Sequence, residues 1–462
     1  MRVRQLRATS YVGSSLVVVA CLIPLWLWAQ AAPFGLRFGD ATATLRSIAV
    51  LCGLSGIVAF ACNLVLGSRV AVLEPLFGGL DRMYRIHHTV GLVSFNLLLA
   101  HGGLMLASAA TNSLGAAVRL VLPVPNWTVT LGALALVGMI VVMGLTLYAR
   151  VNHEVFLWVH RFFGLVFLLG AVHAFRTPGT KALSPALTIY LAAFVLAGLV
   201  AYTYRSLLGD LLVRRRRYRV AHINRRGGEV AEITLSPSNG ALPFTPGQFV
   251  FLTFESSSMR AWFRPFSREP AGQTELVSLR TGAVRKQFHP FSITSAPGQR
   301  ELQVAIKASG DYTTALEHLQ VGDQAVIEGP YGSFSYRHVP RRKQVWIAGG
   351  IGVTPFLSMA RSLPDDYDVD FFYAVKSRTQ GYFIDDFEDL TRSHPNLRLI
   401  TFPEDEVGFL TAEEIEQRSG DLGDKEILMC GPKVMTQALE AQFHALGVPR
   451  ARIHYEEFGF AR

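Results

Sequence analysis

Four histidines occur as two pairs that close off apolar stretches of the sequence. Residues 87–101 are HHTVGLVSFNLLLAH and residues 160–173 are HRFFGLVFLLGAVH, and in both segments the first histidine is followed four positions later by glycine. A polar side chain inside an apolar span is costly and indicates a functional role. A single histidine there is equally well explained by a hydrogen bond to a neighbouring helix. Two matching pairs favour ligation of haem iron, for which neutral imidazole is a common ligand.

The spacing within each pair determines where the imidazoles point on a helix. His101 lies 14 residues after His87, which is ~21 Å along the axis of a helix. The side-chain direction rotates over this distance to ~40° short of a whole number of turns, so both rings face roughly the same way. His173 lies 13 residues after His160, which leaves ~140° between these two side chains in a regular helix. We therefore expect the second helix to be overwound locally, or His173 to lie where it ends, close to Pro178.

Two parallel helices of this kind can hold two haems, one near each leaflet of a membrane. We predict that His87 and His160 bind the inner haem and that His101 and His173 bind the outer haem. His88 is an alternative to His87, but helix geometry and the match with the second segment favour His87. Two histidines on each iron leave no coordination position for a substrate, so such a site would transfer electrons.

Six apolar stretches are expected to position these histidines across a lipid bilayer. The chain has 462 residues, of which 50% are hydrophobic and only 17% are charged, and this composition excludes an ordinary soluble protein. Crossing the ~30 Å hydrocarbon core takes about 20 apolar residues. The first stretch has no convincing cleavage site, so we expect it to be retained as a helix. The six stretches are residues 11–32, 45–67, 88–109, 127–149, 156–175 and 186–208.

Basic residues gather on one side of the six expected spans, while the opposite loops hold fewer. Positive residues near span ends favour the cytoplasmic side. We therefore expect an integral protein of the bacterial inner or cell membrane, with both termini and the second half of the chain in the cytoplasm. The third and fifth spans then run in the same direction. The residues on the cytoplasmic side are Arg2, Arg4, Arg7, Arg69, Arg82, Arg85, Arg150, Arg205 and the run Arg214–Arg217.

Cysteine content and charge exclude other kinds of site. The four cysteines are scattered and form no CxxC pair, which argues against a disulfide framework, a zinc knuckle or an iron–sulfur cluster. The net charge of +9 includes the run Arg214–Arg217, but there is no basic stripe with interleaved aromatic residues. We therefore expect no nucleic-acid partner.

The sequence after Arg217 changes from apolar spans to short strands. Runs such as 248–252, 301–307 and 324–329 are separated by proline and glycine, which predicts a small antiparallel barrel. From about residue 340, strand and helix patterns alternate, which predicts a parallel, doubly wound sheet. The expected fold is a multi-domain membrane protein: a six-helix all-α transmembrane bundle (1–213), an antiparallel β-barrel (214–338) and an α/β doubly wound domain (339–462).

The repeated HxxxG…His pattern, with HEVFLWVHR (153–161) at the start of the fifth span, resembles the ferric reductase-like transmembrane family. That domain is shared by NADPH oxidases and ferric-chelate reductases, and the likeness covers roughly residues 45–210. The second half is similar to the FAD and NADP domains of ferredoxin–NADP reductases. The resemblance implies two b-type haems in 1–213, FAD in 214–338, and NADPH, or alternatively NADH, in 339–462.

Two segments of the barrel resemble flavin-binding motifs. In HPFSITS (289–295) an aromatic residue beside a hydroxyl can pack on the isoalloxazine ring. In GDYTTAL (310–316), Gly310 permits close approach, and Thr313 opens a helix whose N-terminal amides favour the pyrophosphate. RPFS (264–267), within a segment longer than a barrel connection needs, is an imperfect second copy, and the complete small-residue tail favours HPFSITS. The resemblance assigns FAD contacts to His289, Pro290, Phe291, Ser292, Thr294, Gly310 and Thr313.

Two segments of the last domain resemble the pyridine-nucleotide site of ferredoxin–NADP reductases. GGIGVTPF (349–356) follows a strand and precedes a helix, although it lacks the third glycine of the dinucleotide fingerprint. By resemblance its glycines let the backbone meet phosphate, Thr354 starts the helix, and MCGP (429–432) lies beside the nicotinamide. The residues assigned in this way are Gly349, Gly350, Gly352, Thr354, Cys430, Gly431 and Pro432.

Two further residues complete the expected nucleotide site. Arg378, just past the second strand of this domain, is placed to pair with a 2′-phosphate, which favours NADPH over NADH. In the tail HYEEFGF (454–460), the resemblance implies an aromatic shield over the flavin, for which Phe458 is preferred and Phe460 is the alternative.

Together these features imply electron transfer from cytoplasmic NADPH through FAD and two bis-histidine haems to an acceptor on the opposite side. Dioxygen reduced to superoxide and ferric chelate reduced to ferrous iron both suit such a donor. A partner redox protein or a quinone is an alternative acceptor. A transporter with histidine proton relays is disfavoured, because it leaves the nucleotide half unused. We expect no catalytic acid–base pair, because the cofactors carry the chemistry.

Overall fold

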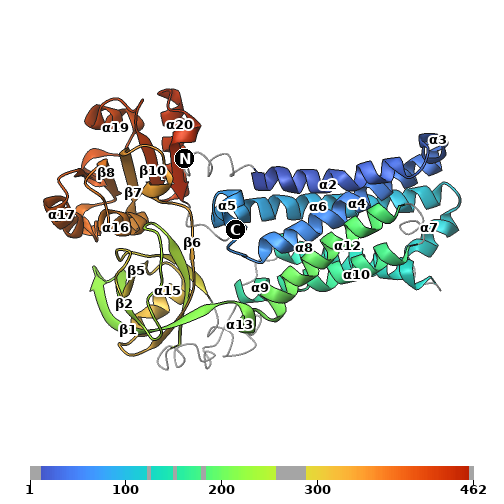
Figure 1. Cartoon of the computed structure of the whole chain (residues 1–462), viewed down its shortest axis with the longest axis horizontal. Helices are drawn as coiled ribbons and strands as arrows, with labels where there is room; N and C mark the ends of the chain where they lie inside the picture. Colours follow the sequence, from blue (N-terminus) through green and yellow to red (C-terminus); the bar gives the residue numbers. More distant parts are fainter. Residues whose placement is uncertain (1–11, 122–125, 149–152, 178–183, 256–287, 457–462) are drawn as a thin grey trace, which may run out of the picture. The chain divides into compact units, whose positions relative to one another are not determined.

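The computed structural model describes residues 12–121, 126–148, 153–177, 184–255 and 288–456. The chain forms two compact units, which divide between Val213 and Arg214. Figure 1 shows the helices of the first unit and the two sheets of the second.

The first unit contains six helices that are long and apolar enough to cross a membrane, as predicted. The fifth span consists of two helices, and the sixth continues from its last α-helix into a π-helical turn, Thr203–Leu207. The spans are α2 (Val12–Gln30), α4 (Ala41–Gly67), α6 (Leu80–Ala110), α8 (Trp127–Tyr148), α9 with α10 (His153–Arg161 and Phe163–Arg176) and α12 (Pro185–Tyr202). Short helices between and after them are α3 (Phe34–Arg37), α5 (Glu74–Phe77), α7 (Leu114–Val121) and α13 (Gly209–Leu212).

Two of these helices begin at least four residues before the apolar stretches that were predicted for them. The Asp40 side chain accepts a hydrogen bond from the Ala43 amide at 2.7 Å, so α4 begins at Ala41 instead of residue 45. Helix α6 begins at Leu80 instead of residue 88, directly after Gly78 and Gly79, which both have positive φ. Hydropathy alone does not report the polar first turns of such helices.

Helix α4 is the most buried span of the bundle. Half of its most apolar stretch is buried, compared with 28% or less in the other five spans. It packs against α2, α6 and α12. Ser94 of α6 donates a hydrogen bond to the Gly56 carbonyl at 3.0 Å, and a Cβ added at Gly56 would lie 2.9 Å from Leu98. Small residues on α4 therefore let α6 approach its backbone closely.

The second unit begins with an antiparallel six-stranded sheet in the order β4-β3-β6-β1-β2-β5. An isolated bridge between Ile293, directly after β4, and Val304 within β5 closes the barrel. Gly227 and Gly228, both with positive φ, form the tight turn between β1 and β2. The strands are β1 (Arg215–Arg226), β2 (Val230–Pro237), β3 (Phe249–Glu255), β4 (His289–Ser292), β5 (Leu302–Lys307) and β6 (Gln324–Tyr331).

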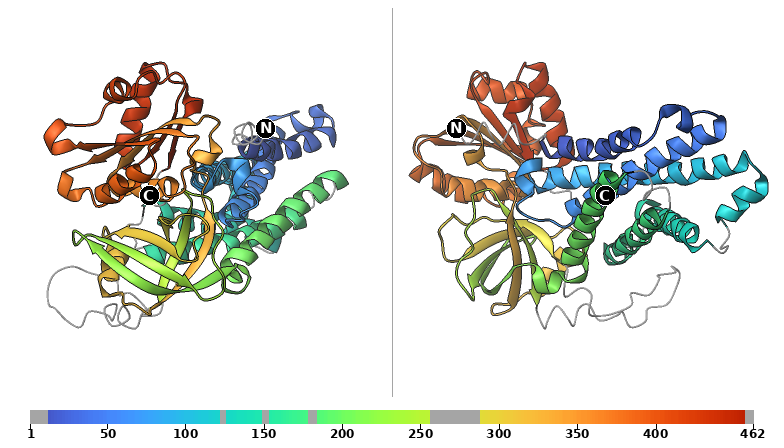
Figure 2. Two further views of the ribbon diagram at one scale, coloured as in Figure 1. Left: turned by 60° about the vertical axis from the view of Figure 1, so that its left-hand side comes forward. Right: turned by 45° about the vertical axis from the view of Figure 1, so that its right-hand side comes forward.

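The remainder of the unit is a parallel five-stranded sheet in the order β11-β10-β7-β8-β9, with helices on both faces (Figure 2). One hydrophobic core lies between the sheet and the helices α16 (Thr354–Ala360) and α17 (Ile384–Ser393). A second hydrophobic core lies between the sheet and the helices α19 (Ala412–Ser419) and α20 (Lys433–Ala445). The strands are β7 (Lys343–Gly349), β8 (Asp368–Val375), β9 (Leu397–Pro403), β10 (Glu426–Cys430) and β11 (Ile453–Glu456). The predicted fold class is confirmed in all three parts.

Candidate functional site

The four predicted haem ligands come together as the two expected pairs. The ring centroids of His87 and His160 are 6.0 Å apart, and those of His101 and His173 are 6.3 Å apart. Metal–imidazole bonds of ~2.0–2.1 Å, with the nitrogen ~1.1 Å from the ring centre, put two opposed rings on one metal ~6.3 Å apart. The spacing of both pairs therefore fits one metal ion between each pair of rings.

Hydrogen bonds orient three of these rings. Nδ1 of His87 lies 3.1 Å from the Asn63 carbonyl, and Nδ1 of His101 lies 2.8 Å from the Ala49 carbonyl. Nδ1 of His173 lies 2.9 Å from the Thr128 carbonyl. A carbonyl only accepts, so each Nδ1 carries the proton and each Nε2 keeps its lone pair for a metal. These backbone contacts support haem ligation by Nε2.

His160 differs from the other three histidines. Its Nδ1 is buried and has no hydrogen-bond partner among the residues that the structure describes. It lies at the end of α9, and its ring stacks on Phe156 with centroids 5.2 Å apart.

The environment of His87 also distinguishes it from the neighbouring His88. His87 is half-buried and bonded to the backbone of α4, whereas His88 is exposed. The His87 ring lies 6.0 Å from the His160 ring, close to the spacing of two opposed rings on one metal ion. These observations favour His87 as the inner ligand on α6.

The fifth span is interrupted between its two histidines. Phe162 separates α9 from α10, and its amide donates to the Val159 carbonyl at 3.0 Å, an i→i−3 bond that tightens the helix. His173 also lies in the last turn of α10. The tighter turn adds rotation along the span and so reduces the ~140° mismatch that a regular helix would give between His160 and His173.

Tyr202 of α12 lies against the interruption in the fifth span. Its hydroxyl donates to the Arg161 carbonyl at 2.9 Å, and a Cβ added at Gly164 would clash with its ring. In the third span, a Cβ added at Gly91 would lie 2.9 Å from Nδ2 of Asn63. The glycine of each HxxxG segment therefore makes room for a polar residue of a neighbouring helix, which the sequence did not reveal.

Glycines on the facing helices also make room for the imidazoles. A Cβ added at Gly53 of α4 would lie 2.8 Å from Nδ1 of His101, and one added at Gly132 of α8 would lie 2.6 Å from Nδ1 of His173. The outer pair lines an apolar cavity of about 800 Å³, whose lining also includes Arg46 and Arg176. Mostly apolar walls with few polar groups are typical of a cofactor site.

In the barrel, the two predicted flavin motifs lie side by side. The rings of His289 and Tyr312 stack with centroids 4.0 Å apart, which joins β4 to α15 (Asp311–Ala315). Burial raises the pKa of Tyr312 to about 12, and its hydroxyl accepts a hydrogen bond from the Phe254 amide at 3.2 Å. Pro290 and Phe291 pair with β3 between His289 and Ser292.

Two hydroxyl groups of HPFSITS suit a ligand. Ser292 and Thr294 are 3% and 0% exposed, and their hydroxyl oxygens have no hydrogen-bond partner within the described part of the chain. Buried polar groups are costly unless they are paired, so a bound flavin would supply the missing partners. The competing segment RPFS (264–267) lies outside the described residues.

The second flavin motif differs in detail from the prediction. Gly310 is the N-cap of α15, and Thr313 is its third residue, so Thr313 does not open the helix. The Thr313 hydroxyl accepts from the Ser309 and Gly310 amides at 2.9 and 3.0 Å and lies 3.0 Å from the Gly310 carbonyl. These bonds make Thr313 a capping residue. Within the described part of the chain, no atom lies within 4 Å of a Cβ added at Gly310, which leaves space for a ligand.

The predicted pyridine-nucleotide segments meet where the strand order of the parallel sheet reverses, between β7 and β10. Ligands of such sheets bind at this point, beyond the carboxyl ends of the strands. A Cβ added at Gly352 would clash with the Cys430 carbonyl, and one added at Gly431 would lie 3.0 Å from Gly349. Gly350 has φ of +53°, and no described residue lies within 4 Å of a Cβ added there.

Other predicted residues of this site lie at the same edge of the sheet. Thr354 begins α16, as expected, and its hydroxyl donates to the Ile351 carbonyl at 3.0 Å. Pro432 is the N-cap of α20. Burial raises the pKa of the Cys430 thiol well above its ordinary value, so it remains protonated. Phe458 and its alternative Phe460 lie outside the described residues.

Arg378 is exposed and already has a carboxylate partner. Its Nε lies 3.0 Å from Oε1 of Glu406, in α18 (Glu404–Val407), which follows β9. An exposed ion pair contributes little stability, so a nucleotide phosphate can compete for Arg378. Glu406 was not identified from the sequence, because no local pattern connects it with Arg378.

Replacing Gly132 by alanine should displace the His173 ring, because the new Cβ would lie only 2.6 Å from it. We expect the purified variant to bind about one haem per chain less than the wild type, since disturbed ligand orientation weakens metal binding. Haem content can be measured as the pyridine haemochrome. The control is Gly144→Ala on the same helix, where the new Cβ meets nothing within 4 Å among the described residues. Equal haem content in both variants would contradict the prediction.

Replacing Gly310 by alanine should weaken FAD binding by about 10-fold or more, equivalent to ~1.4 kcal/mol. The backbone at Gly310 is extended and the new Cβ meets no atom of the residues that the structure describes, so thermal unfolding should not change. FAD affinity can be measured by flavin fluorescence during titration of the apoprotein, with Ser309→Ala as the neighbouring control. Unchanged affinity would remove Gly310 from the flavin site.

Three regions of the chain match known families. Residues 52–171 match the ferric reductase like transmembrane component, residues 226–336 match the oxidoreductase FAD-binding domain, and residues 346–441 match the oxidoreductase NAD-binding domain. The first match includes His87, His101 and His160 and ends two residues before His173, and the other two matches lie in the barrel and in the parallel sheet.

The sequence identity between this chain and individual relatives is low. The chain is 25% identical over 269 residues to the reductase component of propane 2-monooxygenase from Rhodococcus jostii, covering 55% of this chain and 66% of that protein. It is 27% identical over 266 residues to a flavohemoprotein from Deinococcus radiodurans, covering 53% of this chain and 59% of that protein. The chain thus spans between half and two thirds of the length of these relatives.

Among solved structures, the chain is similar to the FAD/NAD binding domain of a nitric oxide dioxygenase from Vibrio cholerae. The identity is 24%, with 53% of this chain and 98% of that chain covered, and the TM-score is 0.42. As the predicted resemblance implied, the chain combines a ferric reductase-like transmembrane domain with FAD-binding and NAD-binding oxidoreductase domains.

Proposed function

We propose that this protein transfers electrons from NADPH, through FAD and two bis-histidine haems, to an acceptor on the opposite side of the membrane. The observation that carries the proposal is the pair of imidazole contacts at 6.0 and 6.3 Å, spaced along one helix of a ferric reductase-like domain. When bound, FAD exchanges a hydride with nicotinamide and single electrons with haem, and a haem with two histidine ligands exchanges one electron at a time.

The residues of the chain hold and orient these groups. We propose His87 with His160 as ligands of the inner haem and His101 with His173 as ligands of the outer haem. Backbone carbonyls orient three of the four rings. Mostly apolar side chains of the surrounding helices line the cavity beside the outer pair.

The nucleotide sites are proposed on the second unit. FAD is assigned to the barrel, at His289–Ser292, Thr294 and Gly310, with Thr313 supporting the turn. The dinucleotide is assigned to Gly349, Gly350, Gly352, Thr354 and Cys430–Pro432. We propose the domain limits 1–213, 214–338 and 339–462, with both termini and the last two domains in the cytoplasm.

The acceptor is proposed to be dioxygen or a ferric chelate, because both accept electrons without a coordination position on iron. A membrane module that passes electrons to a partner protein or quinone is the second candidate. NADPH consumption by the purified protein, with dioxygen alone and then with ferric chelate, separates them. Activity with neither acceptor that returns with membrane extract would favour the partner.

The decisive measurement is the content of haem and flavin per chain. We expect about two haems and one FAD in the detergent-solubilised protein, with the absorption of low-spin, bis-histidine haem. A protein without haem absorption after supply of iron-porphyrin would rule the proposal out.

His101→Ala should remove about one haem per chain and leave reduction of FAD by NADPH intact, because the two sites lie on separate parts of the chain. Haem content and anaerobic flavin bleaching measure the two effects separately. Loss of flavin reduction in this variant would contradict the proposed order of electron transfer.

Arg378→Ala should raise KM for NADPH about 10- to 150-fold, equivalent to ~1.5–3 kcal/mol for a charged hydrogen bond, and KM for NADH much less. Glu406→Gln should lower KM for NADPH, because it removes the carboxylate that occupies Arg378. Steady-state rates with both nucleotides test this, with the exposed Arg392→Ala as control. An unchanged NADPH preference in Arg378→Ala would exclude Arg378 from the site.

A further inference from the structure

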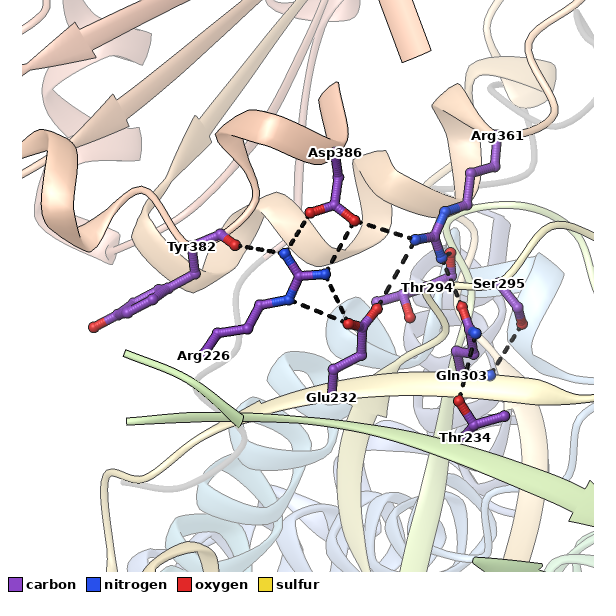
Figure 3. Close-up of polar contacts among 9 residues, drawn as sticks. All are labelled: Arg226, Glu232, Thr234, Thr294, Ser295, Gln303, Arg361, Tyr382 and Asp386. Carbon is purple, nitrogen blue, oxygen red and sulfur yellow. Dashed lines mark hydrogen bonds and ion pairs between the residues drawn. The ribbon is translucent and has the colours of Figure 1, made fainter. Parts of the chain in front are cut away.

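A group of two arginines and two carboxylates joins the barrel to the parallel sheet (Figure 3). The barrel contributes Arg226 from β1 and Glu232 from β2. The other domain contributes Asp386 from α17 and Arg361, directly after α16. All four side chains are 22% exposed or less. Each domain therefore supplies one positive and one negative charge, and the group is neutral only when both are in place.

The contacts within this group cross between the two domains. Arg226 Nη2 donates to Glu232 at 2.8 Å within the barrel and to Asp386 at 3.1 Å across the boundary, and Nη1 donates to the second Asp386 oxygen. Nη2 of Arg361 lies 3.7 Å from Asp386 and 3.9 Å from Glu232. Burial lowers the pKa of Arg361, and both carboxylates oppose that effect.

Arg361 also reaches the flavin motif itself. Its Nη1 donates to the Thr294 carbonyl at 2.8 Å and to Oε1 of Gln303 at 2.8 Å. One turn earlier, the Ser358 hydroxyl donates to the Ser295 carbonyl at 2.7 Å. Thr294, Ser295 and Ser358 are fully buried, so water cannot replace these bonds. The tail of HPFSITS is thus attached directly to α16.

Helix α16 begins at Thr354, immediately after the glycines assigned to the dinucleotide. One short, buried path therefore connects the loop 349–352 to His289–Ser292, through Ser358 and Arg361. A second contact supports it, since Tyr382 packs over the β1–β2 turn at Gly227 and its hydroxyl donates to Glu229 at 2.7 Å.

We propose that Arg361 is a positioning residue for hydride transfer from NAD(P)H to FAD, and this rests on the function proposed above. The transfer moves a hydride from nicotinamide to the flavin ring, so the dinucleotide is oxidised and the flavin is reduced. The two rings are held by different domains, and reacting atoms must come within about 3–3.5 Å. By attaching α16 to the flavin motif, Arg361 sets the distance between the two rings.

The test uses Arg361→Gln in the full-length, FAD-loaded protein under anaerobic conditions. Rapid mixing with NADPH, and separately with NADH, gives the rate of flavin bleaching and the long-wavelength absorption of stacked nicotinamide and flavin. Because a misplacement of ~1 Å can cost about 100-fold, we expect the rate at saturating nucleotide to fall about 10- to 100-fold per bound flavin. The stacking absorption should weaken, and the nucleotide concentration for half-maximal rate should change little.

Two further variants distinguish positioning from general stability. Arg361→Lys keeps the charge and should recover part of the rate and of the stacking absorption. Arg392→Gln, on α17, removes an exposed arginine that pairs only with Asp389 of its own helix among the described residues, and should match the wild type. If Arg361→Gln does not retain FAD, Arg361→Gln combined with Glu232→Gln restores charge balance and is measured instead.

The outcomes separate the inference from the function on which it rests. A full rate per bound flavin and full stacking absorption in Arg361→Gln, or in the charge-balanced double variant, would overturn the role of Arg361. Failure of both NADPH and NADH to bleach the wild-type flavin would overturn the proposed function instead.

Discussion

Hydrocarbon around the first unit offers no hydrogen-bonding partners, so its polar side chains must find them within the protein. The imidazoles of His87, His101 and His173 meet this requirement through Nδ1, each bonded to a backbone carbonyl of a neighbouring helix. Because Nδ1 makes these hydrogen bonds, Nε2 of each ring remains available to bind a metal ion. These hydrogen bonds also require close helix contacts, which Gly53 and Gly132 provide by leaving space for the rings. The orientation of the proposed haem ligands therefore depends directly on how closely the helices pack.

A related constraint governs the second unit, where charges are buried between two domains. A buried charge is stable only when it is paired, so Arg226, Glu232, Arg361 and Asp386 hold one another in place. Because Arg361 is also bonded to the Thr294 carbonyl, the ion pairs extend to the flavin motif. Both units thus position proposed cofactor sites by pairing polar groups that are partly or fully buried in the protein.

Much of this organisation was predicted from patterns local in the sequence. Apolar length predicted the six spans, and alternating strand and helix patterns predicted the parallel sheet, because both patterns depend only on residues near one another in the chain. The His87/His101 spacing placed both rings on one face of a helix, where the structure has them opposite His160 and His173. The family matches confirm the assignment of the three regions to a ferric reductase-like, an FAD-binding and an NAD-binding domain.

Local sequence patterns specify which residue types could bind a cofactor and along which helices or strands they lie. Their partners follow from the packing of these elements: Asn63 beside His87, Tyr202 against the interruption at Phe162, Glu406 on Arg378, and Arg361 on the flavin motif. The structure also assigns Thr313 a capping role. The physical reason is that helical and strand periodicity follow from local backbone geometry, whereas these contacts join residues that come together only after the helices and sheets have packed.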